Sequence, residues 1–415
     1  MAYLLNLANY TVKTMVYVFF FISICVVLHI WLFTYVLNLA DDVSSIFSIR
    51  KCLETNSKHI KHILIWTNFY YYHLIKDGKV ILPSLNCSNS NCVFTKNKAL
   101  FDEDYSRFDA ILFNEDILNS KDRPLNRNQD QVYIFNTLES SQVVPACEVY
   151  NDGFFNLTFT YRLDSDIMWS YFVVRNRKGK IVAPSISVKW RTSSRPVVKK
   201  IKSVLAGKRK AAVWLVSDCE ADSLRDEYLT RLQEHLFHFG LKIDVYGKCS
   251  HKRCPNDDCD KVIKKHYYFY MAFENSSAED YVTEKVLYGY RNYAVPVVYG
   301  GANYSRFLPP SSYINAREMH PYNLAFAMYQ AIKTPALYET YFKWTNLYTI
   351  NADYKSDHPI CNLCNTLHRN QIYSTKDKFR LWWNGRNGMK WCLSTEYWNE
   401  TANINIDTRH ILKLY

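Results

Sequence analysis

Two basic residues, Arg225 and Lys285, occupy matched positions in the sequence, each in the first turn of an expected helix that follows an expected buried strand. Helix N-termini bind anions through their free N–H groups and dipole, and a cation there is unfavourable unless an anion joins it. The pair therefore predicts a pyrophosphate site, although two exposed surface charges would have the same spacing. Neither a G-x-G-x-x-G fingerprint nor a G-x-x-x-x-G-K-[ST] loop occurs in the sequence.

Residues 271–285, MAFENSSAEDYVTEK, place a dense polar group directly after an apolar run. In parallel α/β sheets, ligands bind outside the carboxyl ends of the strands. Because Glu274 and Asn275 leave the expected strand at such an end, we expect them to lie beside a ligand.

Three charged residues, Arg162, Asp164 and Asp166, alternate along TYRLDSDI (160–167). Alternate side chains of an extended segment share one face, and buried charges are rarely unpaired. We therefore expect Arg162 to pair with a carboxylate and to support a cleft instead of taking part in catalysis directly. A metal site made by Asp164 and Asp166 is the alternative.

Strand and helix patterns predict an α/β protein with two domains. In the second domain, continuous apolar runs alternate with segments of helical periodicity, which is typical of crossover units and a parallel sheet. Asp222 or Ser223 is expected to cap a helix with apolar positions between 224 and 239. The expected strands are 61–67, 108–114, 132–140, 211–217, 242–247, 269–275 and 295–301.

The N-terminal region contains an uncharged apolar stretch, residues 15–37, which is long enough to cross a bilayer as a helix. Lys13 precedes it and two aspartates follow it, which favours a cytosolic N-terminus. A cleaved signal peptide is the competing interpretation, but its apolar core is usually only ~7–15 residues long.

The chain of 415 residues is longer than a single hydrophobic core usually supports. We divide it into a cytosolic tail, an anchor, a stem, a first α/β domain, a linker, a second α/β domain and a cysteine-containing C-terminal segment. In that order the parts are 1–14, 15–37, 38–60, 61–195, 196–210, 211–350 and 351–415.

Twelve cysteines fit a compartment that permits disulfides. Close pairs of cysteines indicate either disulfides or zinc ligands, and disulfides are favoured because no His-x₃₋₅-His partner is present. Sequence does not give the connectivity. The disulfide candidates are Cys87, Cys92, Cys249, Cys254, Cys361 and Cys364.

Composition excludes disorder for most of the chain, since 48% of the residues are hydrophobic and 16% are aromatic. The formal net charge of +12 is compatible with an anionic ligand or with a solvated surface. We expect no nucleic-acid partner, because the predicted topology places the body of the protein outside the cytosol and the nucleus.

Several blocks, taken in order, closely resemble the α1,3-fucosyltransferase family. They are TYRLDSDI, VWLVSDC, KIDVYGKC, FENSSAEDYVTEK and VPVVYGGANYSRFLPPSSYINA. The ending, CNLCNTLH (361–368) followed by WW (382–383) and Cys392, is most similar to the core-type members that modify N-glycans. The resemblance covers about residues 61–395.

The resemblance implies a type II Golgi membrane enzyme with two Rossmann-like domains that face each other across a cleft, the GT-B arrangement. GDP-fucose would bind the second domain and an N-glycan acceptor the first. Arg225 and Lys285 would contact the diphosphate, while Asn275, Tyr281 and Glu284 would line the donor site together with Glu274. Glu284 would stabilise an oxocarbenium-like transition state. No metal ion would be required, and stimulation by divalent cations is left open.

The same resemblance nominates Glu139, in NTLES (136–140), as the base that takes the acceptor proton in an inverting transfer. An exposed loop glutamate is the alternative. Relatives carry Ser-Pro and a nearby His where this sequence has Ser-Ser-Gln (140–142). Asp218 replaces the asparagine that is common in the family, and Asn275 forms a sequon that we expect to carry no glycan.

Two other functions are compatible with the sequence. A catalytically silent Golgi relative that binds glycans would also fit the departures at Ser141 and Asp218, but it would not need a diphosphate clamp together with a base. The second is a transferase that uses another sugar nucleotide, and it would retain both the diphosphate clamp and the base. Among fucosyltransferase acceptors, the innermost GlcNAc of N-glycans is preferred and antennal GlcNAc is the alternative.

Overall fold

The computed structural model describes residues 60–67, 75–76, 79–80, 87–354, 357–369, 371–388 and 392. The predicted tail and anchor (1–37) lie outside the described residues, and so does the predicted stem except for Ile60. Within the described ranges, no helix is both long enough and apolar enough to cross a membrane.

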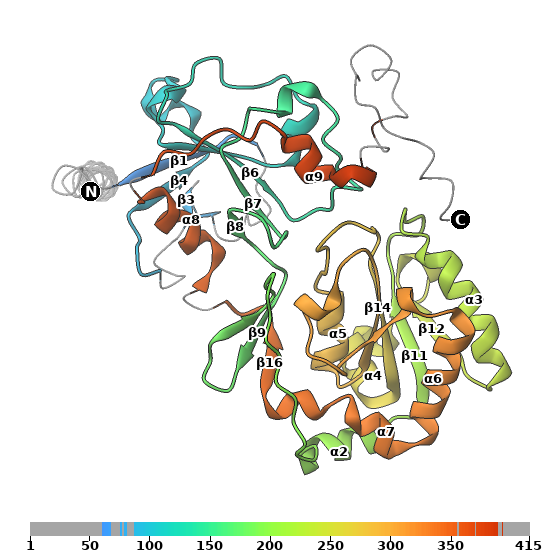
Figure 1. The fold of residues 1–415 in the computed structure, drawn as a ribbon. Coiled ribbons are helices and arrows are strands. Elements are labelled where there is room, and N and C mark those ends of the chain that lie inside the picture. The colour runs from blue at the N-terminus through green and yellow to red at the C-terminus, as the bar shows by residue number, and fades with distance from the viewer. Residues whose placement is uncertain are drawn as a thin grey trace, which may run out of the picture. The chain divides into compact units, whose positions relative to one another are not determined.

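The first lobe is built on an eight-stranded sheet with the order β2-β3-β4-β1-β5-β6-β7-β8 (Figure 1). The pairings from β4 to β8 are parallel, whereas β3 pairs antiparallel with both β2 and β4. The strands are β1 (Lys61–Ile65), β2 (Ile75–Lys76), β3 (Lys79–Val80), β4 (Cys92–Thr95), β5 (Ala110–Phe113), β6 (Val132–Thr137), β7 (Leu157–Thr160) and β8 (Ile167–Met168). The predicted strands at 61–67, 108–114 and 132–140 are confirmed as β1, β5 and β6.

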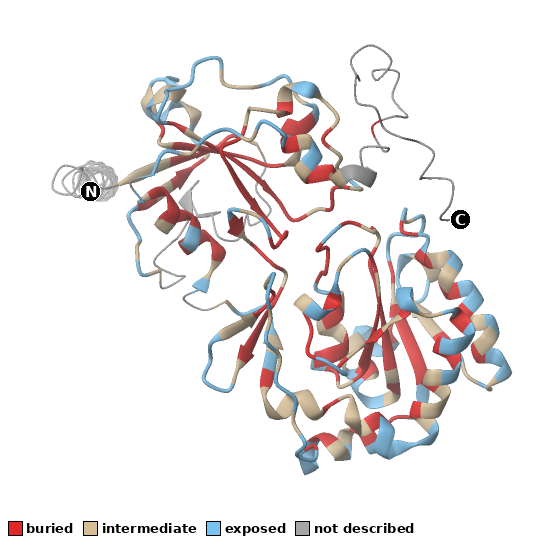
Figure 2. Cartoon of the chain, in the orientation of Figure 1, coloured by how far each residue is buried: buried red, intermediate tan, exposed pale blue. Residues whose placement is uncertain are grey.

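The second lobe contains a five-stranded parallel sheet with the order β12-β11-β13-β14-β15. Its central strands are buried on both faces (Figure 2), as their continuous apolar sequences predict. The strands are β11 (Lys210–Leu215), β12 (Ile243–Tyr246), β13 (Tyr267–Phe273), β14 (Val295–Tyr299) and β15 (Ile314–Asn315). The helices are α3 (Arg225–His238), α4 (Cys259–His266), α5 (Lys285–Arg291), α6 (Pro321–Lys333) and α7 (Pro335–Thr340). The predicted alternation of strand and helix is confirmed.

The C-terminal segment returns to the first lobe. Strand β16 (Tyr348–Asn351) joins β9 (Val173–Asn176) and β10 (Ile181–Ala183) in an antiparallel sheet. Helices α8 (Pro359–Leu367) and α9 (Phe379–Gly388) then contribute apolar side chains to the same core cluster as β1, β5 and β6. The first lobe is therefore completed by residues from the far end of the chain.

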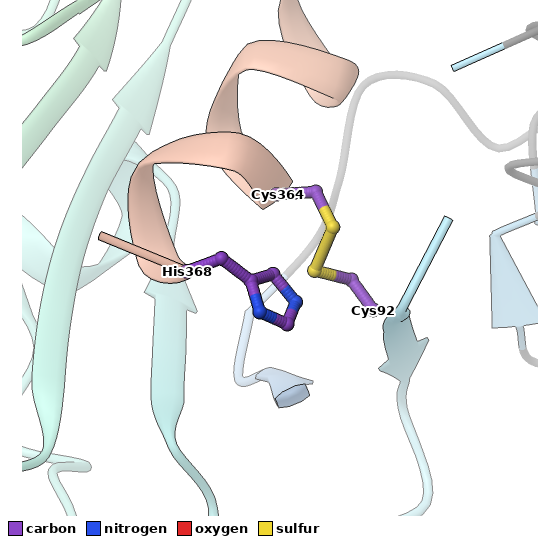
Figure 3. Close-up of side chains that lie close together, drawn as sticks. All are labelled: Cys92, Cys364 and His368. Atoms are coloured by element: carbon purple, nitrogen blue, oxygen red, sulfur yellow. A yellow bond between two sulfur atoms is a disulfide. The ribbon is translucent and has the colours of Figure 1, made fainter. Parts of the chain in front are cut away.

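Five disulfides hold the described chain together, and three of them bind the C-terminal segment to the first lobe. The bonds are Cys87–Cys361, Cys92–Cys364, Cys147–Cys392, Cys219–Cys249 and Cys254–Cys259. His368 lies beside the Cys92–Cys364 bond (Figure 3) and completes a trio of metal-ligand types. Because the two sulfurs are bonded to each other, this trio offers no thiolate pair to zinc. The disulfide interpretation is confirmed for all six candidate cysteines, which are Cys87, Cys92, Cys249, Cys254, Cys361 and Cys364.

Three local predictions differ from the structure. The stretch 196–210 contains helix α2 (Lys199–Ala206), which the sequence analysis treated as linker. Neither Asp222 nor Ser223 caps α3, because Leu224 precedes the helix in a left-handed conformation and Ser223 donates to the Glu274 carbonyl instead. Residues 161–166 form bends and turns, so Arg162, Asp164 and Asp166 do not alternate along an extended strand.

Lys208 is fully buried between two helix ends. Its Nζ donates to the carbonyls of Lys264 and Asn292 at 3.2 Å each, and to that of Ile263 at 3.5 Å. Burial and, to a smaller extent, the charge of Lys264 lower the pKa of Lys208 to about 7. The three carbonyls lie at the C-terminal ends of α4 and α5. Lys208 therefore links the C-terminal ends of these two helices through its hydrogen bonds.

This lysine predicts a pH dependence of stability. Between pH 7 and about 10.4, the unfolded chain holds a proton at Lys208 that the folded chain has released, so the free energy of unfolding rises with pH. The melting temperature of the wild type should therefore rise from pH 6 to 9 relative to that of Lys208→Met. Lys200→Met, at an exposed position, should show the wild-type slope. Equal slopes in the wild type and Lys208→Met would contradict the prediction.

Candidate active site

A cavity of about 730 Å³ lies at the carboxyl ends of β11, β12 and β13. This is the end of a parallel α/β sheet at which ligands are expected. The first residues of α3 and α5, Arg225 and Lys285, both line it. The two cations that the sequence predicted for one anion site therefore line the same cavity.

Arg225 enters the cavity wall from a buried position, with only 3% of its side chain exposed. Its Nη1 donates to the Phe273 carbonyl at 3.0 Å and its Nη2 to the Asp218 carbonyl at 2.6 Å. Nε makes no hydrogen bond to any described residue. Burial lowers the pKa of Arg225 against the opposing effect of Asp218 and Asp226. An anion in the cavity would relieve this cost, because it would pair with N–H groups that are still free.

Lys285 is held by a buried carboxylate. Its Nζ donates to Oε2 of Glu274 at 2.8 Å and to the Thr283 hydroxyl at 3.0 Å. Glu274, with 1% of its side chain exposed, also accepts from the Thr283 backbone N–H at 2.8 Å. Burial opposes the charge of Lys285, but Glu274 and Glu284 outweigh that effect and raise its pKa. Glu274 therefore keeps Lys285 charged and in place.

The mouth of the cavity is built from a loop that the sequence analysis did not assign to the site. Lys248, His251, Lys252 and Arg253 all line the cavity, and the disulfides Cys219–Cys249 and Cys254–Cys259 close their loop. With these residues included, five cationic side chains outnumber the three carboxylates of Asp218, Asp257 and Glu284. The net positive lining favours an anionic ligand. The available signal was the basic run KCSHKRC directly after a predicted strand.

Gly247 is required at the start of this loop. Its φ of 112° lies in the left-handed region, and an added Cβ would come within 2.3 Å of the Val216 carbonyl oxygen. The close approach places the loop directly over the end of β11. The basic side chains that follow are thereby directed to the cavity.

Glu139 follows β6 in the first lobe and lies outside the residues that line the cavity. Its Oε1 accepts a hydrogen bond from the Tyr281 hydroxyl at 3.0 Å and one from the Ser140 backbone N–H at 2.8 Å. Tyr281 is 3% exposed and belongs to the segment between β13 and α5. The two lobes therefore meet directly at Glu139.

Two neighbouring residues of the first lobe bind the same segment. The hydroxyls of Ser140 and Ser276 lie 2.6 Å apart in a buried position. Gln142 accepts from the Ser277 backbone N–H at 2.7 Å and donates to the Asp222 carbonyl at 3.3 Å. These contacts connect the Ser-Ser-Gln sequence to the two loops that precede Arg225 and Lys285.

Comparisons with known proteins agree with these observations. Residues 58–172 match the family model "Fucosyltransferase, N-terminal", and residues 205–382 match "Glycosyltransferase family 10 (fucosyltransferase) C-term". Alpha-(1,3)-fucosyltransferase C of Drosophila melanogaster is 35% identical over 341 residues, which is 77% of each chain. The chain belongs to glycosyltransferase family 10, the fucosyltransferases.

Further relatives extend the comparison. The human 4-galactosyl-N-acetylglucosaminide 3-alpha-L-fucosyltransferase FUT5 is 32% identical over 336 residues, which cover 77% of this chain and 79% of the relative. A crystal structure of an alpha1,3-fucosyltransferase with GDP aligns with a TM-score of 0.47 at 15% identity, over 78% of this chain and 94% of that one. The two family models and the relatives in Drosophila melanogaster and humans confirm the α1,3-fucosyltransferase family that the sequence motifs indicated.

The structure divides the residues predicted for this fucosyltransferase site into two groups. Arg225, Asn275, Glu284 and Lys285 line the cavity together with Asp218. The others lie next to it: Glu274 and Tyr281 are buried behind the lining, and Glu139 contacts Tyr281 from the first lobe. The roles that the resemblance implies for these residues stay predictions.

Arg162 makes the predicted carboxylate pair. Its Nε and Nη2 donate to the two oxygens of Asp164 at 3.0 Å each, and its Nη1 donates to the backbone carbonyls of Trp382 and Trp383. Asp166 instead pairs with Lys376 at 3.0 Å. Each aspartate therefore has its own cationic partner. The Arg162–Asp164 pair joins the first lobe to the C-terminal segment through the two tryptophan carbonyls, and the Asp166–Lys376 pair joins them directly.

The Glu274–Lys285 pair can be tested by exchange. Lys285→Met alone leaves a buried carboxylate unpaired and should lower the free energy of unfolding by about 3 kcal/mol. The double variant Glu274→Gln/Lys285→Met should recover most of this loss, because neither charge remains. Denaturant titration measures both values. A double variant as unstable as the single one would mean that the pair is not the source of the effect.

The same variants test the anion site. Pyrophosphate should bind the double variant at least about tenfold more weakly than the wild type, because one charge-assisted hydrogen bond is lost. Lys242→Met, at a side chain 74% exposed and outside the cavity, serves as the control. Calorimetric titration with pyrophosphate provides the readout, and unchanged affinity in the double variant would remove Lys285 from the site.

Proposed function

We propose that this fucosyltransferase moves L-fucose from GDP-fucose to the 3-hydroxyl of a GlcNAc residue in glycoprotein glycans, with inversion at the sugar carbon. The observation that carries the proposal is the convergence of Arg225 and Lys285 in one cavity at the strand ends. A nucleoside diphosphate is the leaving group that matches two such cations. Asn275 and Glu284, in the same lining, provide polar contacts for the rest of the donor.

In this proposal the chemistry is divided between the lobes. Arg225 and Lys285 neutralise the charge that develops on GDP as the bond from fucose to the diphosphate breaks. Glu284 stabilises the positive charge that builds up on the fucose ring. Glu139 takes the proton of the acceptor hydroxyl while its oxygen forms the new bond to the sugar carbon.

The acceptor we propose first is the innermost GlcNAc of N-glycans. The support is the similarity of residues 361–368 and of Trp382–Trp383 to core-type members of the family. A second candidate is an antennal GlcNAc that carries galactose. The printed names of several relatives, such as the FUT5 enzyme of humans and the FUT3 enzyme of Pan troglodytes, describe galactosyl-N-acetylglucosaminide substrates.

We also propose that residues 15–37 anchor the enzyme in the Golgi membrane with the catalytic lobes in the lumen. The five disulfides support an oxidising compartment. Transfer should require no metal ion, because Arg225 and Lys285 supply the positive charge at the leaving group. Activity that survives EDTA would support this part, and activity restored only by added divalent ions would overturn it.

Glu139→Gln tests the assignment of the base. The variant should lose at least about a hundredfold in kcat, because an amide cannot take the proton, while its affinity for GDP should equal that of the wild type. Radiolabelled transfer and calorimetric titration with GDP measure the two quantities separately. Weakened GDP binding with normal turnover would mean that Glu139 serves the donor instead.

The acceptor is tested with defined glycans. The full chain in detergent should transfer fucose from GDP-fucose to an N-glycan, and mass spectrometry of the product locates the new residue at the core or on an antenna. Other sugar nucleotides should give no product. Glycan binding without any transfer would select the silent relative, and transfer from a different sugar nucleotide would select the other transferase.

A further inference from the structure

The two oxygens of the Glu139 carboxylate have different surroundings. Oε1 accepts from the Tyr281 hydroxyl and from the Ser140 N–H, whereas Oε2 accepts no hydrogen bond from any residue that the structure describes. A carboxylate fixed through one oxygen presents the other in a defined direction. The arrangement suits a general base, which needs a free lone pair at a fixed position.

The donor that fixes Oε1 comes from the other lobe. Tyr281 lies 142 residues from Glu139, in the segment that begins with Glu274 and ends with Lys285. Its ring is held edge-on by Tyr161 at 5.0 Å and by Tyr171 at 6.1 Å. Tyr171 is fixed in turn by a hydrogen bond to the Leu138 carbonyl, one residue before Glu139. The Tyr281 hydroxyl therefore has little freedom to move.

Resting on the function proposed above, we propose that Tyr281 is a positioning residue that orients the Glu139 base from the donor-binding lobe. Its hydroxyl holds Oε1 and leaves Oε2 for the proton of the acceptor. Because Tyr281 belongs to the same segment as Lys285, the base is aligned by the chain that also grips the diphosphate. Ser140–Ser276 and Gln142–Ser277 also fasten this segment to the first lobe, a few residues before Tyr281.

The chemistry of the tyrosine supports this role. Burial, followed by the influence of Tyr171 and Glu139, raises the pKa of Tyr281 far above its ordinary value, so its hydroxyl remains a donor at every working pH. The other titratable and charged groups that act on this cluster of tyrosines are Arg162, Glu274, Asp280 and Glu284. None of them changes in the variants below.

Tyr281→Phe is the test, because it removes one hydroxyl and keeps the ring. In the full chain in detergent, kcat should fall roughly ten- to hundredfold while the affinity for GDP stays within about twofold of the wild type. Loss of a donor disfavours the charged form of a carboxylate, so the acidic limb of the pH profile of kcat/KM should move up by about one pH unit. A purely structural role would lower activity without moving that limb.

Tyr161→Phe is the matched control. Tyr161 is equally buried and packs on Tyr281, but its hydroxyl donates to no carboxylate among the described residues. The acidic limb of the pH profile of kcat/KM in Tyr161→Phe should coincide with that of the wild type. A fall in kcat with the limb unmoved in Tyr281→Phe, or an equal shift in Tyr161→Phe, would overturn the inference.

A second replacement covers the case in which Tyr281→Phe does not fold. Incorporation of 3-fluorotyrosine at position 281 keeps the hydroxyl and makes it a stronger donor, so the acidic limb should move to lower pH, opposite to the shift in Tyr281→Phe. An unmoved limb would refute the positioning role. The base assignment is judged separately: an active Glu139→Gln enzyme would reject the proposed function, whereas an inactive one together with unmoved limbs rejects only the role of Tyr281.

Discussion

Two consecutive residues at the end of β13, Phe273 and Glu274, hold the two cations at the starts of α3 and α5. The Phe273 carbonyl accepts from Arg225, and the Glu274 carboxylate accepts from Lys285. Arg225 is the first residue of α3 and Lys285 is the first residue of α5. Their side chains therefore come from two different helices and meet at the end of β13. Glu274 balances Lys285, whereas Arg225 is held mainly by uncharged carbonyls with Asp218 at 3.6 Å. The cavity therefore retains positive charge that a diphosphate can neutralise.

This arrangement depends on a rigid support in the second lobe. The parallel sheet fixes the end of β13 between β11 and β14, and the buried amino group of Lys208 links the C-terminal ends of α4 and α5. On the opposite side, the disulfides Cys219–Cys249 and Cys254–Cys259 close the basic loop over the cavity. Cross-links lower the freedom of such a loop, so its positive side chains are already close to where an anion would bind.

Short polar contacts link the first lobe to that site. Residues of the C-terminal segment complete the core of this lobe and support those contacts. Glu139, Ser140 and Gln142 each bond to the segment between β13 and α5. Behind them, Arg162 joins the turn after β7 to the Trp382 and Trp383 carbonyls. Of the three side chains of Ser-Ser-Gln (140–142), those of Ser140 and Gln142 bind the loops that follow β11 and β13.

The sequence by itself determined the strands and helices of the second lobe and the resemblance of the chain to a known family. Apolar runs such as 211–217 and 269–275 predict buried strands of a covered parallel sheet, and the matched positions of Arg225 and Lys285 follow from the repeat of strand and helix. The motifs were long enough to indicate the fucosyltransferase family. Disulfide partners, by contrast, depend on which distant segments meet, so Cys87–Cys361 and Cys92–Cys364 were not predictable from spacing.

Only the tertiary structure decided how the polar residues are partnered. Glu274 looked like a ligand contact in sequence, but it is buried and holds Lys285, because a carboxylate at a strand end bonds whichever cation packs over it. The Ser223 hydroxyl donates to the Glu274 carbonyl instead of capping α3. The Tyr281 hydroxyl donates to Glu139, which lies 142 residues away in the sequence. A sequence pattern reports the periodicity of burial along the chain. The partner of a polar group depends on contacts between elements, and those exist only once the chain has folded.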